Sequence, residues 1–494
     1  MQLSKSRIMS ALQCRKRLYF EVHHPELREI SAATQAAFDT GHRVGDVAQQ
    51  IYGQGRGILI EYGPGLAKAL RDTESLMTAG VDEPIFEATF SHGGVLVRLD
   101  VLIPEGPNPQ SPAWRIVEVK ASTKVKDEHV ADCAIQAWVF QGLGYDLGEI
   151  ALAHVDKSYE YPGGEDFGGL LFEEDLTSEI ADLQDSVPAW VELAREAATG
   201  EMPEVPVGQH CTTPYHCPFF AQCWPTETTY PVQGLGGSKE KLGQLVTAGY
   251  KDIRDVPVTV LDGNETQSRI HRVTVAGQAE RLEGAAIFVQ ELPFPRYYLD
   301  FETIMPAIPI WPGTHPYETH AVQWSCHIED SADSLRHEEF LDLSGDPPMR
   351  PLAESLVEVL GDDGPILMYT SYEAKVIRSL AERFPDLAPQ LHAILDRLVD
   401  LHPVVKTNYY HPNMLGSWSL KAVLPTIAPD IDYSALEEIQ EGTAASNAYL
   451  EAISPDTSAE RREQIRARLL EYCRLDTEAM VRVVRFLKGR QFQA

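Results

Sequence analysis

The sequence lacks any long apolar run. No segment approaches the roughly 18 consecutive apolar residues that a membrane-spanning helix requires. Residues 1–20 contain neither an apolar core nor a small-residue cleavage site, so no secretory signal is visible and we expect a cytoplasmic protein. Internal repeats and long low-complexity segments are also missing. The composition, with 44% hydrophobic and 23% charged residues, is typical of an ordinary soluble globular protein with no membrane partner.

Positive charge is scarce. The chain has 42 Lys and Arg residues against 73 Asp and Glu residues, which gives a formal net charge of −31. This balance argues against a protein that coats DNA non-specifically, because phosphate contacts need Lys and Arg. Two islands are nevertheless basic: residues 1–20, which contain no acid, and residues 461–490, with nine basic and four acidic residues. They are either the positive edge of a nucleic-acid channel or solvated helix faces.

Cysteine is rare as well, and the odd number of seven does not suggest a disulfide framework. Three cysteines, Cys211, Cys217 and Cys223, lie close together in a loop-rich stretch. Clustered thiols in a reducing compartment usually hold a metal. The isolated ones are expected to be ordinary core or near-core thiols: Cys133, Cys326 and Cys473.

A chain of 494 residues is too long for one compact core, so we expect several domains. Composition separates residues 1–228, which end in the cysteine cluster, from residues 229–292, which combine short helices with glycine-rich breaks. Residues 293–494 begin with a strong strand pattern after Pro293 and Pro295. The middle region either grips a nucleic-acid backbone through loop N–H groups or packs as a linker.

The first group of chemically reactive residues lies on two β-rich runs, residues 95–103 and 115–120. A Gly/Pro/Asn-rich turn at residues 106–112 predicts a hairpin that brings Asp100 close to Glu118. Glu118 and Lys120 are two apart and share a strand face. An acid pair with a lysine suits metal-assisted phosphodiester hydrolysis, in which carboxylates hold Mg²⁺ and the lysine stabilises negative charge. The alternative is an ion pair on an exposed sheet face.

The neighbouring segments extend this pattern. Glu87 lies on a predicted strand at residues 84–90, and Gln136 lies in a predicted helix at residues 131–143, four residues before Phe140. This part of the chain resembles the PD-(D/E)XK nucleases of the RecB type. The resemblance implies metal ligation by Asp100 and Glu118, catalysis by Lys120 and support by Gln136.

One position departs from that family. Many RecB-like nucleases carry a metal-binding His near the first helices, and Gly45 stands at the matching spacing in this sequence. Three alternatives follow: His42 replaces the missing ligand, Glu87 completes the site, or the site is weaker than usual.

The three clustered cysteines and Cys14 form a further pattern. Cys14 follows a Ser4-Lys5-Ser6 segment and precedes Leu18-Tyr19. One early cysteine with three cysteines behind the core resembles the iron–sulfur RecB-like nucleases, among them the CRISPR-associated RecB-like exonucleases. The resemblance implies that Cys14, Cys211, Cys217 and Cys223 bind a [4Fe-4S] cluster. Structural Zn²⁺ remains the alternative, because four thiolates suit it equally well.

The second reactive group lies in the last third of the chain. Asp300 and Glu302 share one face of an aromatic-rich strand. Two carboxylates on a buried-looking strand repel each other, and a divalent metal between them resolves the repulsion. Tyr472 and Asp476 are four apart on a predicted helix, and Glu373 begins another helix after a strand at residues 365–370.

This ordered set resembles the DnaQ-like 3′–5′ exonucleases of the RNase H fold, in the DEDDy subtype. The resemblance implies two-metal hydrolysis, with Asp300, Glu302, Glu373 and Asp476 as ligands and Tyr472 orienting the attacking water. Glu373 stands where the family usually has Asp. Most of residues 293–490 also look like an uncharacterised bacterial domain found behind RecB-like nucleases. Asp400 is a further ligand or an ordinary cap, and Lys421 either contacts a phosphate or is solvated.

These patterns together predict an α/β multidomain protein. We expect a RecB-like core of the restriction-endonuclease type, a small helical connector and an RNase H-like mixed-sheet exonuclease domain. The predicted function is that of a nuclease dependent on Mg²⁺ or Mn²⁺, acting on single-stranded or end-containing DNA in repair or defence. The alternatives are an RNA exonuclease and a non-catalytic nucleic-acid-binding scaffold with degenerate sites.

Overall fold

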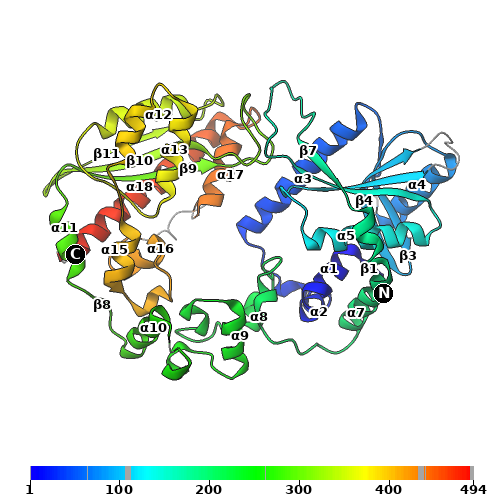
Figure 1. Cartoon of the computed structure of the whole chain (residues 1–494), viewed down its shortest axis with the longest axis horizontal. Coiled ribbons are helices and arrows are strands. Elements are labelled where there is room, and N and C mark those ends of the chain that lie inside the picture. Colours follow the sequence, from blue (N-terminus) through cyan, green and yellow to red (C-terminus); the bar gives the residue numbers. More distant parts are fainter. Residues whose placement is uncertain are drawn as a thin grey trace. The chain divides into compact units, whose positions relative to one another are not determined.

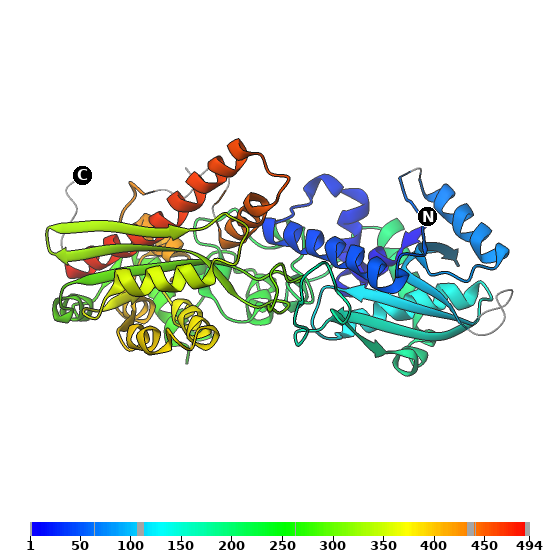
Figure 2. The ribbon, with the colours of Figure 1, turned by 90° about the horizontal axis from the view of Figure 1, so that it is seen from above.

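The computed structural model describes residues 2–63, 65–105, 113–261, 263–431, 439 and 441–489. The chain forms two compact units. Unit 1 comprises Met1–Trp224 and Pro306–Tyr317, and unit 2 comprises Pro225–Met305 and Glu318–Ala494. Each unit combines helices with a mixed β-sheet (Figures 1 and 2), which confirms the α/β multidomain class. Within the described ranges, no helix has both the length and the apolarity to span a bilayer.

Unit 1 is built on a seven-stranded sheet. Its strands are β1 (Leu3–Ser4), β2 (Ile58–Leu59), β3 (Ile85–His92), β4 (Val95–Glu105), β5 (Ala113–Lys120), β6 (Leu147–Val155) and β7 (Leu171–Asp175). Its helices are α1 (Lys5–Gln13), α2 (Arg15–His23), α3 (Ala32–Gly53), α4 (Leu66–Ala79), α5 (Asp127–Gly142), α6 (Thr177–Ala181), α7 (Val187–Thr199) and α8 (Phe220–Cys223). Short 3-10 turns lie at Pro25–Leu27, Gln184–Ser186 and Gln209–Cys211.

The strand order in unit 1 is β2-β3-β4-β5-β6-β7, and β1 pairs with β4. Strands β3, β4 and β5 are antiparallel to their neighbours within this trio, whereas β5 and β6 are parallel. The predicted hairpin at residues 95–120 therefore exists as β4 and β5, although its turn at residues 106–112 lies outside the described residues. Helix α5 fills the crossover from β5 to β6, which a parallel pair requires.

Burial explains these elements. Alternate side chains of β4, such as Val97, Leu99 and Val101, are buried, as expected for a strand with one face on the core. Helix α5 is buried along most of its length and contributes Ile135 and Phe140 to the core cluster. A helix buried in this way can present polar side chains to the sheet only where they find partners.

Pro306–Tyr317 is a short segment far along the chain that belongs to unit 1. Ala307 and Ile308 are buried in a small core cluster with Val44, Val155 and other apolar residues. The backbone of the segment also pairs with residue Tyr161, which accepts from Gly313 N at 2.8 Å and donates to Thr314 O at 3.0 Å. The segment therefore completes the core of unit 1.

Unit 2 contains a five-stranded sheet and a two-stranded one. Its strands are β8 (Glu280–Arg281), β9 (Arg296–Ile304), β10 (His320–Ser331), β11 (Ser334–Leu341), β12 (Ile366–Met368), β13 (Leu398–Asp400) and β14 (Tyr409–Tyr410). Its helices are α9 (Lys239–Thr247), α10 (Glu265–Ala276), α11 (Gly284–Glu291), α12 (Met349–Leu360), α13 (Tyr372–Arg383), α14 (Ala388–Leu395), α15 (Leu401–Asn408), α16 (Leu420–Val423), α17 (Gly442–Ile453) and α18 (Ala459–Lys488). Its 3-10 turns lie at Val232–Leu235, Ile253–Asp255, Val258–Val260, Pro412–Met414 and Leu424–Thr426.

The large sheet of unit 2 has the order β11-β10-β9-β12-β13. Strands β9, β10 and β11 are antiparallel in sequence, whereas β12 is parallel to both β9 and β13. Helices α12 and α18 both pack on this sheet, and Figure 2 shows the yellow α12 and the red α18 on opposite faces. The central strand β9 packs against α18, α17 and α13 and is buried almost continuously, as expected for a strand covered on both faces.

Residues 229–292, expected to form a separate connector, lie within unit 2. They do contain short helices, α9 to α11, as expected. Strand β8 pairs with β14, and Gly234 lies directly against Gly416, where an added Cβ would stand 1.8 Å from the Gly234 carbonyl oxygen. Backbone pairing and this close approach tie the region to the C-terminal part of the chain.

Candidate active sites

Three carboxylates of unit 1 form a row across neighbouring strands. The pairing of β3 with β4 places Glu87 opposite Asp100, and the pairing of Val101 with Val117 continues toward Asp100 and Glu118. The Asp100 carboxylate accepts a hydrogen bond from the backbone N–H of Val119 at 2.8 Å. The sheet register therefore brings together carboxylates that are separated in sequence.

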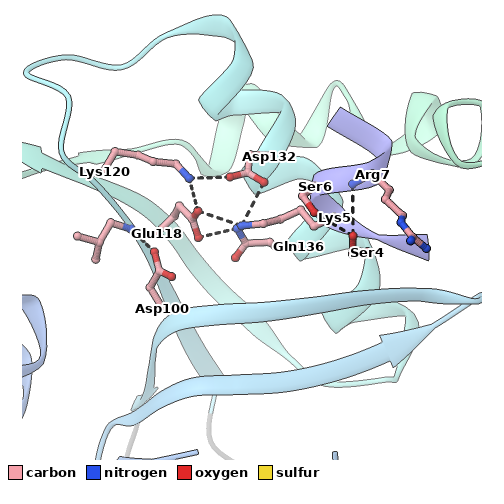
Figure 3. Close-up of polar contacts among 10 residues, drawn as sticks. Ser4, Lys5, Ser6, Arg7, Asp100, Glu118, Lys120, Asp132 and Gln136 are labelled. Carbon is pink, nitrogen blue, oxygen red and sulfur yellow. Dashed lines mark hydrogen bonds and ion pairs between the residues drawn. The ribbon is translucent and has the colours of Figure 1, made fainter. Parts of the chain in front are cut away.

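Glu118 stands in a closed ring of charges (Figure 3). Its Oε1 atom lies 2.9 Å from Lys5 Nζ and 2.5 Å from Lys120 Nζ. On the other side of the ring, Asp132 Oδ1 is 3.1 Å from Lys5 Nζ, and Asp132 Oδ2 is 2.8 Å from Lys120 Nζ. Two ammonium groups and two carboxylates thus alternate around the site, and their charges cancel.

Gln136 binds the second carboxylate oxygen of Glu118. Its Nε2 donates to Glu118 Oε2 at 2.6 Å, and both residues are buried, with exposures of 0% and 1%. Asp132 and Gln136 are four residues apart on α5 and therefore lie on one face of the helix. From this face, Gln136 contacts Glu118 and Asp132 contacts its two lysines. Among the described residues, the buried Oε1 atom of Gln136 has no hydrogen-bond partner.

The two central carboxylates of unit 1 have opposite pKa shifts. Burial opposes ionisation of Glu118, but Lys120 and Lys5 outweigh it and hold the pKa of Glu118 well below its usual range. Burial and the neighbouring Glu118 charge raise the pKa of Asp100 to about 8. Without a metal, Glu118 is therefore the anion and Asp100 is mostly protonated at neutral pH.

Glu87 is held differently. It adopts a left-handed φ of 58° within β3, and its Oε2 lies 2.9 Å from Arg98 Nη2. Burial raises the pKa of Glu87, and the Arg98 charge lowers it. His42 lies exposed on α3, and its charge also acts on Glu87, whereas Gly45 offers no ligand atom. A left-handed conformation at a large side chain is uncommon and accompanies functional sites.

The four cysteines of the predicted cofactor site line one pocket. Cys14 ends α1, and Cys211, Cys217 and Cys223 come from the segment around α8. Lys16 and Arg17 are among the other residues that line the pocket. All four thiols are free of disulfides. Four soft donors therefore converge on one space with cationic neighbours.

The spacing of these sulfurs bears on the choice of cofactor. A tetrahedral zinc site with Zn–S bonds of about 2.3 Å needs sulfurs about 3.8 Å apart. Within the described part of the chain, no three cysteine sulfurs lie within 4.8 Å of one another. Burial raises the pKa of Cys217 to about 11, so its thiol stays protonated unless a metal compensates the thiolate charge.

Unit 2 gathers a second group of carboxylates from three elements. Asp300 and Glu302 come from β9, Glu373 from the start of α13, and Asp476 from α18, which packs on β9. One ligand atom each of Asp300, Glu302 and Cys473 lies within 4.8 Å of the others. The Cys473 thiol donates to Asp300 Oδ2 at 3.5 Å.

The pKa values in unit 2 rise throughout this group. Burial and the Asp476 charge raise the pKa of Glu302 to about 8 and that of Asp300 well above its usual range. Burial chiefly raises the pKa of Glu373 to about 7. Glu373 is 4% exposed, and its Oε2 finds no hydrogen-bond partner in the part of the chain that the structure describes. The group has a large deficit of positive charge, which is the condition that a divalent cation relieves.

Lys421 and Asp400 both have hydrogen-bond partners beside this group of carboxylates. Lys421 Nζ donates to Tyr472 OH at 3.0 Å, so this lysine is engaged at the site and is not merely solvated. Asp400 caps α15 by accepting from His402 N at 2.9 Å, and it also accepts from Thr370 N at 3.2 Å. Asp400 is thus a cap, and it anchors the residue that precedes α13 by two positions.

Three residues of these sites had no assigned role in the sequence. Asp132 precedes Gln136 by one helical turn, a spacing that could have revealed it. Lys5 lies in the Ser-Lys-Ser segment, but its distance of 113 residues from Glu118 left no local signal. Cys473, expected to be an ordinary core thiol, is buried but touches Asp300.

Comparison with known proteins finds a family model that matches part of the chain. Residues 297–419 match the model of a family described as Domain of unknown function (DUF2779), which covers less than half of the chain. No curated protein matches the sequence. A crystal structure of a protein named SSO0001 is similar at 15% identity over 40% of this chain and 74% of that one, with a TM-score of 0.21. So low a TM-score carries no argument about fold or function.

Proposed function

We propose that the chain is a metal-dependent nuclease with two separate centres, one in each unit. The observation that carries the proposal is the buried carboxylate group of unit 2, because Asp300, Glu302 and Glu373 converge there with too few cations to balance them. Divalent metal ions bound to such a group polarise a phosphodiester and activate water. The carboxylates of both units are the oxygen ligands that Mg²⁺ and Mn²⁺ prefer.

The proposed fold of unit 2 is the RNase H-like fold of DnaQ-type exonucleases. Three antiparallel strands followed by two parallel ones, in the order β11-β10-β9-β12-β13, support this assignment. The D-x-E pair lies on the central strand β9, and the Y-x-x-x-D pair lies on α18, which packs against it. Tyr472 is held by Lys421, in a position to orient a water beside the carboxylates.

The proposed fold of unit 1 is the RecB-type restriction-endonuclease core. A helix, three antiparallel strands, a helix and a parallel strand (α4-β3-β4-β5-α5-β6) support it. Asp100 and Glu118 would hold the metal ion, with Glu87 as the nearest further carboxylate in the row. Lys120, paired with Glu118 and Asp132, is placed to stabilise negative charge on a phosphate.

The proposed cofactor of the cysteine pocket is a [4Fe-4S] cluster. Four cysteines line the pocket, and Lys16 and Arg17 supply positive charge beside four thiolates, which supports a [4Fe-4S] cluster while structural Zn²⁺ remains the alternative. Anaerobically purified protein should then be brown, with broad visible absorption that disappears in Cys211→Ser. Stoichiometric zinc and a colourless protein would favour the alternative.

Single-stranded or end-containing DNA is the proposed substrate, by analogy with both families. An RNA exonuclease is the second candidate, because the proposed unit 2 chemistry does not distinguish the two sugars. The non-catalytic scaffold loses support at Glu373, because this carboxylate is buried and interacts with Asp300 although the family usually has Asp there.

End-labelled DNA and RNA strands, incubated with Mg²⁺ or Mn²⁺, test the proposal. Lys120→Ala and Asp300→Ala should each remove a distinct product pattern, by about a hundredfold or more in rate, and the double variant should be inactive. Lys126→Ala, an exposed lysine of unit 1, is the control and should cleave as the wild type does. A double variant that cleaves like the wild type would leave only the scaffold function.

A further inference from the structure

Lys5 is a second lysine of the unit 1 site. It begins α1, directly after Ser4, whose side chain caps that helix by accepting from Arg7 N at 3.3 Å. The preceding strand β1 pairs in parallel with β4, the strand that carries Asp100. The Lys5 side chain is 18% exposed, less than the 27% of Lys120. The fold therefore carries this ammonium group into the site and holds it there.

Lys5 and Lys120 share one carboxylate oxygen. Both contact Oε1 of Glu118, and Gln136 takes Oε2, so both oxygens of this carboxylate are engaged (Figure 3). The two lone pairs of Oε1 are both taken by ammonium groups, so a metal ion that binds this oxygen must displace one of the two lysines. Asp132 offers a separate oxygen to each lysine, so a displaced lysine keeps one partner.

We propose that Lys5 leaves Glu118 when a divalent ion binds and then contacts a phosphate of the nucleic-acid substrate. Asp132 is the positioning residue that keeps both ammonium groups at the site. This inference rests on the proposed nuclease function of unit 1. A buried ammonium group needs an anion, and the substrate phosphate replaces the carboxylate that the metal takes.

Loss of a phosphate-binding Lys5 and loss of a purely structural Lys5 should have different effects on metal affinity and cleavage. Removing a positive charge beside Glu118 strengthens the binding of a cation there, whereas removing a phosphate contact slows cleavage. Lys5→Met should therefore move metal affinity and turnover in opposite directions. A lysine that only pins α1 would, when lost, loosen the site and weaken both.

The experiment uses the full chain with Asp300→Asn and Glu302→Gln, which silences the unit 2 centre. Free Mn²⁺ is measured by electron paramagnetic resonance, and the cleavage rate is measured on end-labelled single-stranded DNA. Lys5→Met should bind Mn²⁺ about tenfold more tightly and cleave about a hundredfold more slowly than this background. Lys5→Arg keeps the charge and should retain the Mn²⁺ affinity, and Lys126→Met is the matched control.

Joint loss of Mn²⁺ affinity and cleavage in Lys5→Met, with a lower melting temperature, would overturn the proposal in favour of a structural tether. Unchanged cleavage in Lys5→Met would overturn it as well, while inactivity of Lys120→Met in the same assay would leave the nuclease function standing. If the background protein neither binds Mn²⁺ nor cleaves, the proposed function of unit 1 itself fails.

Discussion

The carboxylate groups of unit 1 and unit 2 differ in the positively charged side chains that lie beside them. Glu118 in unit 1 is paired with two lysines, and its pKa lies well below the usual range. Glu302 in unit 2 has no such pairing among the interactions that the structure describes, and its pKa rises to about 8. In unit 1 the compensating charge comes from the two lysines of the protein, whereas in unit 2 the Lys421 charge only partly offsets the rise in the pKa of Glu302, and the proposed metal ion would supply the rest.

The raised pKa of Glu302 predicts how pH acts on stability. Its pKa rises from 4.5 to about 8 on folding, so the folded state binds more protons than the unfolded state between these values. The contribution of Glu302 to the free energy of unfolding is therefore fully present below about pH 4.5 and is lost as the pH rises toward about 8. Glu302→Gln removes this loss, so in EDTA at pH 9 it should melt at a higher temperature than the wild type.

Metal ions should reverse that order. If the proposed metal site exists, Mg²⁺ or Mn²⁺ should bind the ionised carboxylates and raise the melting temperature of the wild type more than that of Glu302→Gln. Differential scanning fluorimetry at pH 6 and pH 9, with and without metal, measures both effects. Glu358→Gln, an exposed glutamate on α12, should follow the wild type at both pH values. A Glu302→Gln variant that is less stable than the wild type in EDTA at pH 9 would show that the ionised Glu302 does not destabilise the folded state.

At the scale of elements, loops fix how the helices of residues 229–292 attach to the rest of unit 2. Gly416 has a φ of 78°, and Gly234 lies so close that a Cβ on Gly416 would stand 1.8 Å from its carbonyl oxygen. The two glycines join the 3-10 turn at Val232–Leu235 to the loop before α16. Side chains reinforce this backbone contact: Arg269 donates to the carbonyl oxygen of Lys406, and Arg281 donates to that of Leu487 at 2.9 Å.

Gly416→Ala should therefore destabilise unit 2 by about 3 kcal/mol, from the clash and from the left-handed φ. Urea unfolding, followed by tryptophan fluorescence, measures the loss. Gly442→Ala is the matched control, because a Cβ there meets no atom within 4 Å and the residue begins α17. That substitution should be neutral or stabilise by about 0.5 kcal/mol. Equal stabilities for the two variants would mean that the loops do not touch.

At the scale of the whole molecule, the chain does not divide at a single point. Pro306–Tyr317 belongs to unit 1, although the residues on either side of it belong to unit 2. The segment directly follows β9, which carries Asp300 and Glu302. Cutting the chain after Trp224 would therefore remove Ala307 and Ile308 from the core of unit 1.

Ile308→Ala tests this division in the full chain. Ile308 is 7% exposed and packs with Val44 and Val155, so its truncation should cost unit 1 about 2–3 kcal/mol. Hydrogen exchange measured by mass spectrometry should show faster exchange in α3 and β6. Peptides from β9 and β12 should exchange as in the wild type. Faster exchange in β12 without a change in β6 would assign the segment to unit 2.

The sequence alone determined the local features. The β-rich run of residues 95–103 predicted β4, and the D-x-E and Y-x-x-x-D spacings placed their residues on a strand and a helix that the structure contains. Periodicity is a short-range property of the chain, so it can be read without the fold. The α/β multidomain class follows from the same patterns, and the four cysteines predicted as a group line one pocket.

Only the tertiary structure decided which distant residues meet. Lys5 reaches Glu118 because β1 pairs with β4, and Cys473 reaches Asp300 because α18 packs on β9. The attachment of residues 229–292 to unit 2 and the place of Ile308 in unit 1 depend on contacts of the same kind. Such contacts depend on packing between elements far apart in sequence, and no periodicity within a single segment encodes them.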